Sequence, residues 1–273
     1  MQSFTVRRAI AGGAILIAAM SAALAEERDP KLDRLIAGPQ RSEANRVRDP
    51  YRHPKETLQF FGLKDDMKVV EIWPGGGMWW TEILAPYLAE HGTYYAAMPN
   101  PAAGDEARNG NAAFAAKTAA APALYGKIVT TTLDGDRDKI APDNSVDLVL
   151  TFRNLHDWVP HGTAEASLRA MFAALKPGGI LGIEDHRASD ASPQDPQAKS
   201  GYLREDWTIA MVERVGFKLV GKSEINANPK DTKDYSAGVW TLPPTLRLKD
   251  QDRAKYLAIG ESDRYTLKFQ KPK

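Results

Sequence analysis

Short apolar runs alternate with stretches of helical periodicity over most of the chain. Continuous apolar runs predict strands that are buried on both faces of a sheet. We expect strands over 68–73, 92–97, 128–133, 147–152, 180–183, 217–221 and 236–242, the last two as an antiparallel finish. Helices are expected over 54–61, 81–88, 102–121, 163–175 and 205–215. Strands that alternate with helices predict a doubly wound α/β sheet with ligands at the carboxyl ends of its strands.

The first 25 residues have the three parts of a secretory signal peptide. Arg7 and Arg8 form a positive start, residues 9–20 are apolar and uncharged, and Ala23-Leu24-Ala25 is a small-x-small cleavage site. The apolar stretch is short for a membrane span. We therefore expect export to the periplasm and no stable membrane insertion after cleavage. An uncleaved anchor is the alternative, and the arginine pair also allows export of the folded protein by the twin-arginine route.

The rest of the chain divides into three parts. Residues 26–53 are charged and sparse in apolar side chains, so we expect a helical or irregular N-terminal extension. The main domain is expected to run from 54 to 242. Residues 243–273 form a polar tail whose pattern indicates no particular structure.

Charge and cysteine content restrict the possible partners. With residues 1–25 removed, the chain keeps 34 of its 36 basic residues against 35 acidic ones. A nearly neutral surface gives no reason to expect nucleic acid or an anionic membrane as partner. The chain has no cysteine, so an exported form would depend on an ordinary hydrophobic core and not on disulfides. Nothing in the sequence indicates an oligomeric state.

The strand over 68–73 leads through Glu71 into three consecutive glycines, 75–77, and then into a helix. Glycines let the backbone turn sharply and approach a ligand closely. A strand, a glycine loop and a helix in this order are typical of nucleotide binding. A tight strand-to-helix turn that holds no cofactor is the alternative.

The order of these signals resembles class I methyltransferases that use S-adenosylmethionine. The similarity covers roughly 54–242 and implies a Rossmann-like sheet of that type, here with an N-terminal helical extension. Its further marks are Asp134 after the third strand, 147–149 at the start of the fourth, and Leu175-Lys176-Pro177-Gly178-Gly179 before the fifth. The loop from Trp73 to Gly77 is also similar to a subgroup of predicted bacterial methyltransferases.

The resemblance implies S-adenosyl-L-methionine as cofactor and a small molecule as methyl acceptor. It places the cofactor at Glu71, Gly75, Gly77, Asn100 and Asp134. Glu71 would hold the amino group, and Asp134 would meet the adenine, with a purely turn-forming role for Asp134 as the alternative. Asn100 stands where the family usually has an acid that binds the ribose hydroxyls.

Trp73 departs from the family pattern, which usually has a glycine at this position. An indole there must either pack over the cofactor or occupy its place. The cofactor is made in the cytoplasm, whereas residues 1–25 predict export. An exported protein that binds a ligand in the same crevice without methyl transfer is therefore the alternative function.

Polar residues cluster after the fourth and fifth strands, whose ends the fold should bring together. Methyl transfer needs a nucleophile in line with the methyl group and often a base that takes its proton. The catalytic candidates are His186, Asp185, His156 and Asp157, because each imidazole has a carboxylate beside it that can orient the ring. A structural role as a loop cap is the alternative for His156.

Substrate binding is expected at Arg52, Arg153 and Asn154, since a guanidinium suits a carboxylate or a phosphate. Salt bridges that hold the N-terminal segment over the site are the alternative for the arginines. Histidines and carboxylates also suit a metal ion, but their spacing matches no ligand motif and we expect none. Trp79, Trp80 and Trp158 are expected to pack in the core or at its rim.

Overall fold

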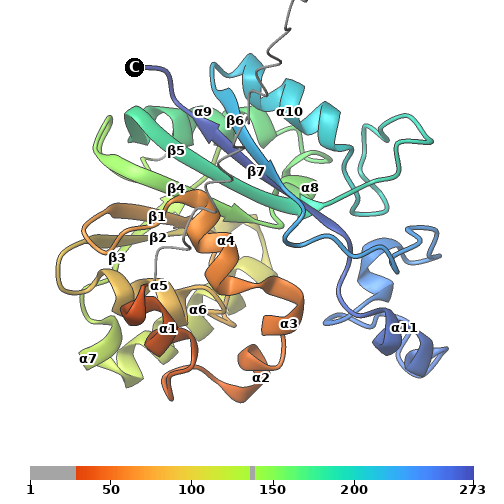
Figure 1. Cartoon of the computed structure of the whole chain (residues 1–273), viewed down its shortest axis with the longest axis horizontal. Helices are drawn as coiled ribbons and strands as arrows, with labels where there is room; N and C mark the ends of the chain where they lie inside the picture. Colours follow the sequence, from red (N-terminus) through yellow and green to blue (C-terminus); the bar gives the residue numbers. More distant parts are fainter. Residues whose placement is uncertain (1–28, 136–138) are drawn as a thin grey trace, which may run out of the picture.

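A seven-stranded sheet forms the centre of the computed structural model, which describes residues 29–135 and 139–273 (Figure 1). The signal peptide expected over residues 1–25 lies outside this range. The strand order is β3-β2-β1-β4-β5-β7-β6, and β7 runs antiparallel to both of its neighbours. In the described part of the chain, no helix is both long and apolar enough to cross a membrane.

The strands and helices lie close to the ranges that periodicity predicts. The strands are β1 (Lys68–Ile72), β2 (Thr93–Pro99), β3 (Val129–Leu133), β4 (Val146–Phe152), β5 (Leu175–His186), β6 (Lys218–Ser223) and β7 (Arg264–Gln270). The longer helices are α4 (Pro54–Phe61), α5 (Thr81–Leu88), α6 (Asp105–Ala120), α9 (Ala164–Ala174) and α10 (Glu205–Arg214). Short helices are α1 (Pro30–Ile36), α2 (Glu43–Arg46), α3 (Asp49–Arg52), α7 (Pro122–Tyr125), α8 (Leu155–Trp158) and α11 (Arg253–Ile259), with 3₁₀ turns η1 (Pro101–Ala103) and η2 (Gly238–Thr241).

Alternate residues of the central strands enter two separate cores, one on each face of the sheet. Val69 and Leu148 pack with α1, α4 and α5, whereas Val70 and Val149 pack with α8, α9 and α10. Both faces are covered, which explains why these strands are apolar throughout and do not alternate with polar residues. Trp79, Trp80 and Trp158 are buried in these cores, as expected.

The seventh strand comes from the C-terminal tail, so the expected strand over 236–242 is wrong. Residues 238–241 form η2 instead, and β7 inserts between β5 and β6. A short apolar run does not distinguish a strand from another buried segment. β7 in turn contains Arg264 and Thr266, which made the tail look polar although both side chains are buried. The boundary at 242 therefore does not separate the tail from the sheet.

Two segments outside the regular α/β alternation meet at the carboxyl ends of β4 and β5. The N-terminal extension is helical and reaches this end through α3, as its charged sequence allowed. The connection between β6 and β7, residues 224–263, reaches it from the other side. Arg48 and Glu261 join the two segments by an ion pair of 2.6 Å. The site is therefore walled by parts of the chain about 210 residues apart in sequence.

Candidate functional site

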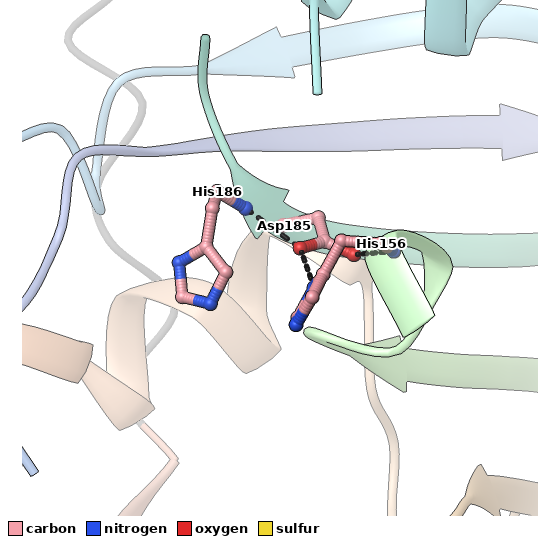
Figure 2. Close-up of side chains that lie close together, drawn as sticks. All are labelled: His156, Asp185 and His186. Carbon is pink, nitrogen blue, oxygen red and sulfur yellow. Dashed lines mark hydrogen bonds and ion pairs between the residues drawn. The ribbon is translucent and has the colours of Figure 1, made fainter. Parts of the chain in front are cut away.

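A histidine and an aspartate form a fixed pair at the carboxyl ends of β4 and β5 (Figure 2). His156 Nδ1 lies 2.7 Å from Oδ1 of Asp185, a fully buried residue of β5. The same carboxylate accepts the backbone N–H groups of Leu155, His156 and His186 at 2.9, 3.3 and 2.7 Å. With so many donors, the carboxylate holds one position and orients the imidazole.

The environment of His156 favours its protonated form. Burial of the ring acts against the charge, but the charge and hydrogen bond of Asp185 and the charge of Asp157 outweigh it and raise the pKa of His156. Oδ1 of Asp157 lies 3.5 Å from Nε2 of the ring, and its side chain is 53% exposed. Asp157 therefore acts on the outer edge of His156, while Asp185 holds the inner edge.

His186 presents a second imidazole beside the first. The ring centroids lie 4.7 Å apart, and Figure 2 shows both rings extending to the same side of β5. Nδ1 of His186 is 2.5 Å from Oγ of Ser262. Burial, and then repulsion from His156 and from three nearby arginines, lower the pKa of His186 well below its ordinary value. The surroundings thus shift the pKa values of the two neighbouring rings in opposite directions, as in sites that contain both an acid and a base.

Arg52 and Arg153 approach the same region from α3 and from the residue after β4. Arg52 is 2% exposed, donates from Nε to Glu261 Oε2 at 3.1 Å and lies over the Trp79 ring at 4.8 Å. Arg153 has φ +60°, a conformation that is costly for a residue with a side chain, and such strain is concentrated at functional sites. Its backbone N–H donates to the carbonyl of Glu184 at 2.7 Å, which holds the turn in place.

Asn154, expected to bind substrate, links two strand ends. Its side-chain amide donates to the carbonyl of Ile72 at 3.0 Å and to Thr151 Oγ1 at 3.1 Å. Both amide hydrogens are used in these bonds, and the residue is 7% exposed. The contacts of Asn154 position the β1 and β4 ends, and its direct contact with a substrate stays a prediction.

The glycine loop after β1 has open space in front of it. A Cβ atom added at Gly75 or Gly77 would meet no protein atom within 4 Å, whereas one at Gly76 would come within 2.9 Å of the Ala113 side chain. Gly75 also has φ +67°, which favours glycine. The loop is therefore packed against α6 at its middle residue and exposes bare backbone on both sides of it, as a close ligand would require.

The Trp73 indole packs to one side of this loop. The residue has φ +49°, and its ring is partly buried and meets the Trp158 ring edge to face at a centroid distance of 5.3 Å. The ring joins the core beneath α8. Which of the two arrangements that the sequence left open holds, an indole packed over a cofactor or one that fills its place, stays a prediction.

Glu71 faces the opposite side of the sheet from Trp73. Its buried carboxyl group accepts hydrogen bonds from Thr81 Oγ1 at 3.0 Å and from the Tyr94 hydroxyl. Burial raises the pKa of Glu71 to about 7, against the opposing effect of these two hydrogen bonds. The role of Glu71 toward a cofactor's amino group stays a prediction, and its observed partners tie β1 to β2 and α5.

Asn100 and Asp134, expected at the cofactor's ribose and adenine, lie next to each other after β2 and β3. Nδ2 of Asn100 donates to Oδ2 of Asp134 at 3.0 Å, and its Oδ1 accepts the backbone N–H of Ala102 at 2.8 Å. The hydrogen bond joins two residues that are 34 positions apart and that the sequence predicts to bind the same ligand. Their contact with a cofactor stays a prediction.

Sequence reasoning missed the contribution of the segment before β7. Glu261, Ser262 and Arg264 are all buried at the site, and Trp240 lies 6.1 Å from the His156 ring. The available signal was the run 261–264 of polar residues directly before an alternation of hydrophobic and polar residues over 265–270. Without β7, which the sequence pattern of the tail does not predict, these polar residues have no position in the sheet.

His156, Asp185 and His186 also place one nitrogen or oxygen atom each within 4.8 Å of one another, a spacing that suits a metal ion. Both oxygens of Asp185 are already hydrogen-bonded, and His186 is surrounded by positive charge. The positive charge around His186 opposes a cation, whereas hydrogen bonds to a carboxylate also occur at metal sites.

Solved structures of the same fold include several methyltransferases, although no protein-family model and no curated protein matches the chain. A SAM-dependent methyltransferase from Aquifex aeolicus has a TM-score of 0.54 at 18% identity, over 90% of this chain and all of that one. The arsenic(III) S-adenosylmethionine methyltransferase of Chlamydomonas reinhardtii has 0.52 at 16%, over 90% and 74%. The [4+2]-cyclase SpnF has 0.54 at 15%, over 81% and 80%.

These similarities establish the fold of the chain. The sheet is a Rossmann-like sheet of the class I methyltransferase type, as the sequence predicts. A cyclase shares the fold with the methyltransferases, so the fold does not by itself assign the reaction. The reaction must be argued from the side chains at the carboxyl ends of the strands.

Proposed function

We propose that the protein transfers a methyl group from S-adenosylmethionine to a small molecule. The observation that carries the proposal is the glycine loop after β1, which presents Gly75 and Gly77 to open space at the carboxyl end of the sheet. In this fold, that edge is where ligands bind. The methyltransferases of similar structure, from Aquifex aeolicus and Chlamydomonas reinhardtii, support the choice of cofactor.

The loop residues fit such a cofactor on chemical grounds. Gly75 and Gly77 would let the cofactor come close to the backbone of the loop. The paired side chains of Asn100 and Asp134 would offer an amide and a carboxylate to its ribose hydroxyls and its adenine amino group. Bound S-adenosylmethionine would supply an activated methyl group. Glu71 would act from beneath the loop, where its hydrogen bonds to Thr81 and Tyr94 fix its position.

Toward the methyl acceptor, the imidazoles of His186 and His156 would have different roles. His186 is held neutral by burial and positive neighbours, so its ring can accept a proton from the acceptor's nucleophilic atom. When Nδ1 donates to Ser262 Oγ, Nε2 carries the lone pair. His156, oriented by Asp185 and favoured in its protonated form, balances the charge of the site and does not take up this proton. Asp157 lies at the exposed edge of the His156 ring.

The cofactor assignment is tested by calorimetry on the mature chain with S-adenosylmethionine and with S-adenosylhomocysteine. We expect Gly77→Ala to keep the fold, because its methyl group meets no protein atom, and to weaken cofactor binding at least tenfold. Gly76→Ala is the contrasting variant, since its methyl group would clash with Ala113 and lower stability. Absence of binding to the wild-type protein at millimolar cofactor would refute the proposal.

An exported ligand-binding protein without methyl transfer is the other function that the sequence raises. Mass spectrometry of a cell extract incubated with the protein and S-adenosylmethionine distinguishes the two. Methylated products that require His186 support the enzyme. Cofactor binding with an unchanged product profile supports a binding protein.

We also propose that the protein works in the periplasm. The proposal rests on residues 1–25 of the sequence alone, with their arginine pair, apolar stretch and cleavage site. Export after folding, by the twin-arginine route, would let the protein carry a cofactor that is made in the cytoplasm. Fractionation of cells and N-terminal sequencing of the exported chain test this, with Glu26 expected as the first residue. A cytoplasmic protein that keeps its N-terminus would contradict it.

A further inference from the structure

Four arginines converge on two carboxylates beside the imidazole pair. Glu261 accepts ion pairs from Arg48 at 2.6 Å, from Arg52 at 3.1 Å and from Arg264 at 3.0 Å. Arg264 also reaches Glu184 at 3.0 Å, and Arg153 is close enough for its charge to act on Arg52 and on Glu261. Four guanidinium groups against two carboxylates give this set of side chains a formal excess of two positive charges. We name Arg48, Arg52, Arg153 and Arg264 the arginine cluster.

Each arginine of the cluster has a buried nitrogen without a hydrogen-bond partner. These atoms are Nη2 of Arg48 and Arg52 and Nε of Arg153 and Arg264, and the described part of the chain supplies no acceptor for them. Burying a charged donor without a partner is costly, so native proteins pair such groups or place a ligand against them. The cluster therefore has the donors for an anion that the chain itself does not contain.

Repulsion within the cluster points to the same missing charge. Burial, and then the charge of Arg153, lower the pKa of Arg52 well below its ordinary value. Arg153 is held at φ +60° on the turn after β4, at a cost in backbone strain. Two guanidinium groups that repel each other in a buried place lose this repulsion when an anion binds between them.

The imidazole pair lies within the field of the cluster. Arg52, Arg153 and Arg264 each lower the pKa of His186. A cation at the imidazoles would face the same repulsion, so the field favours an anionic ligand over a metal ion. It also places the anion next to the neutral imidazole that the proposed reaction uses.

We propose that the methyl acceptor is an anionic small molecule whose carboxylate or phosphate binds between Arg52 and Arg153, next to His186. That the anion is the methyl acceptor rests on the proposed function, whereas the anion site itself is inferred from the arginine cluster alone. Both groups offer the oxygen pair that a guanidinium binds in two parallel hydrogen bonds. The proposed ligand class is therefore a small molecule with a carboxylate or a phosphate, and one probe of each kind distinguishes the two.

Nuclear magnetic resonance of the arginine Nε–H groups tests the site on the mature chain without cofactor. Inorganic phosphate and benzoate are titrated separately, and we expect a saturable shift with the probe that matches the natural group. Arg153→Asn should weaken that binding at least tenfold, and asparagine tolerates the left-handed backbone. Arg52→Lys keeps a charge beside Glu261 but loses the forked donor, and should weaken binding as well. Arg169→Gln removes one exposed charge on α9 and is the matched control, expected to stay within twofold.

Two results would overturn the inference. One is the absence of a saturable shift with either probe up to about 50 mM; the other is an equal effect of Arg153→Asn and the control. Cofactor binding measured on the same samples separates the two proposals. If the anion binds and S-adenosylmethionine does not, the proposed reaction fails and the anion site remains. If only S-adenosylmethionine binds, the anionic acceptor is refuted and the methyltransferase proposal stands.

Discussion

The imidazole rings of His156 and His186 lie 4.7 Å apart, and their surroundings shift their pKa values in opposite directions. The carboxylates of Asp185 and Asp157 raise the pKa of His156, while burial and the positive charges of the arginine cluster lower the pKa of His186. One site therefore contains a proton donor and a proton acceptor made from the same side chain. The difference comes entirely from the neighbours that the fold supplies.

Asp185→Asn should lower the pKa of His156, because the substitution removes the nearest negative charge. The raised pKa of His156 stabilises the folded state below the ring's unfolded pKa of about 6.5, and this stabilisation is lost as pH rises through the folded value. The difference in free energy of unfolding between wild type and variant should therefore shrink as pH rises. Titration of the His156 ring by nuclear magnetic resonance and urea unfolding at several pH values measure both effects. An unchanged pKa of His156 in the variant would contradict the pairing.

His186→Gln should reduce the loss of folding stability that wild type shows as pH falls below about 6.5. The pKa of His186 is lowered in the folded protein, so the unfolded chain binds a proton first as pH falls below about 6.5 and the folded state loses stability. A single group of this kind contributes a slope of up to about 1.4 kcal/mol per pH unit. Unfolding midpoints between pH 5 and 7 should depend less on pH in the variant. His91→Gln, at an exposed histidine, is the control and should leave the slope unchanged.

Glu71→Gln should raise the free energy of unfolding relative to wild type, and this gain should grow as pH rises from 5 to 8. The pKa of Glu71 is raised to about 7, so the folded state holds a proton that the unfolded chain has released above about pH 4.5. Wild-type stability contributed by this group therefore falls with rising pH, by roughly 3 kcal/mol at most. Glutamine keeps the shape of the protonated carboxyl group and does not titrate. Glu90→Gln, at an exposed glutamate, should show no such gain, and an equal gain in both variants would refute the assignment.

Trp73→Gly should lower stability but leave cofactor affinity within about threefold. Glycine accepts φ +49° without strain, yet the variant loses the packing of the indole on Trp158, worth roughly 2 kcal/mol. Thermal unfolding and calorimetry with S-adenosylmethionine measure the two quantities. A gain in affinity of more than tenfold would mean that the indole occupies space that the cofactor needs.

Several expectations from the sequence depended on local pattern, and these agree with the structure. The helix over 54–61 and the helix over 81–88 have the expected bounds, because their apolar spacing and their first residues are local signals. β1 and β4 follow from apolar runs that are buried on both faces of the sheet. His156, Asp185 and His186 meet because strand ends in a parallel sheet share an edge, which the strand order alone predicts.

Residues whose role depends on distant partners could not be assigned in this way. β7 was missed because Arg264 looks like a surface residue until Glu184 and Glu261, both buried, are placed against it. No sequence pattern shows that the side-chain amide of Asn154 donates to the carbonyl of Ile72, 82 residues away. The direction of the Trp73 ring depended in the same way on Trp158.

The sequence by itself determined the class of sheet, the glycine loop and the strand ends at which chemistry was to be expected. These features are written in hydrophobic periodicity and turn residues, which act over a few positions. Only the tertiary structure decided the charge at the site, because it brings Arg48 and Arg52 from one end of the chain against Glu261 and Arg264 from the other. Electrostatic energy depends on distance in space, and burial strengthens it, so a chain of nearly balanced overall charge can contain a buried group of strongly positive side chains.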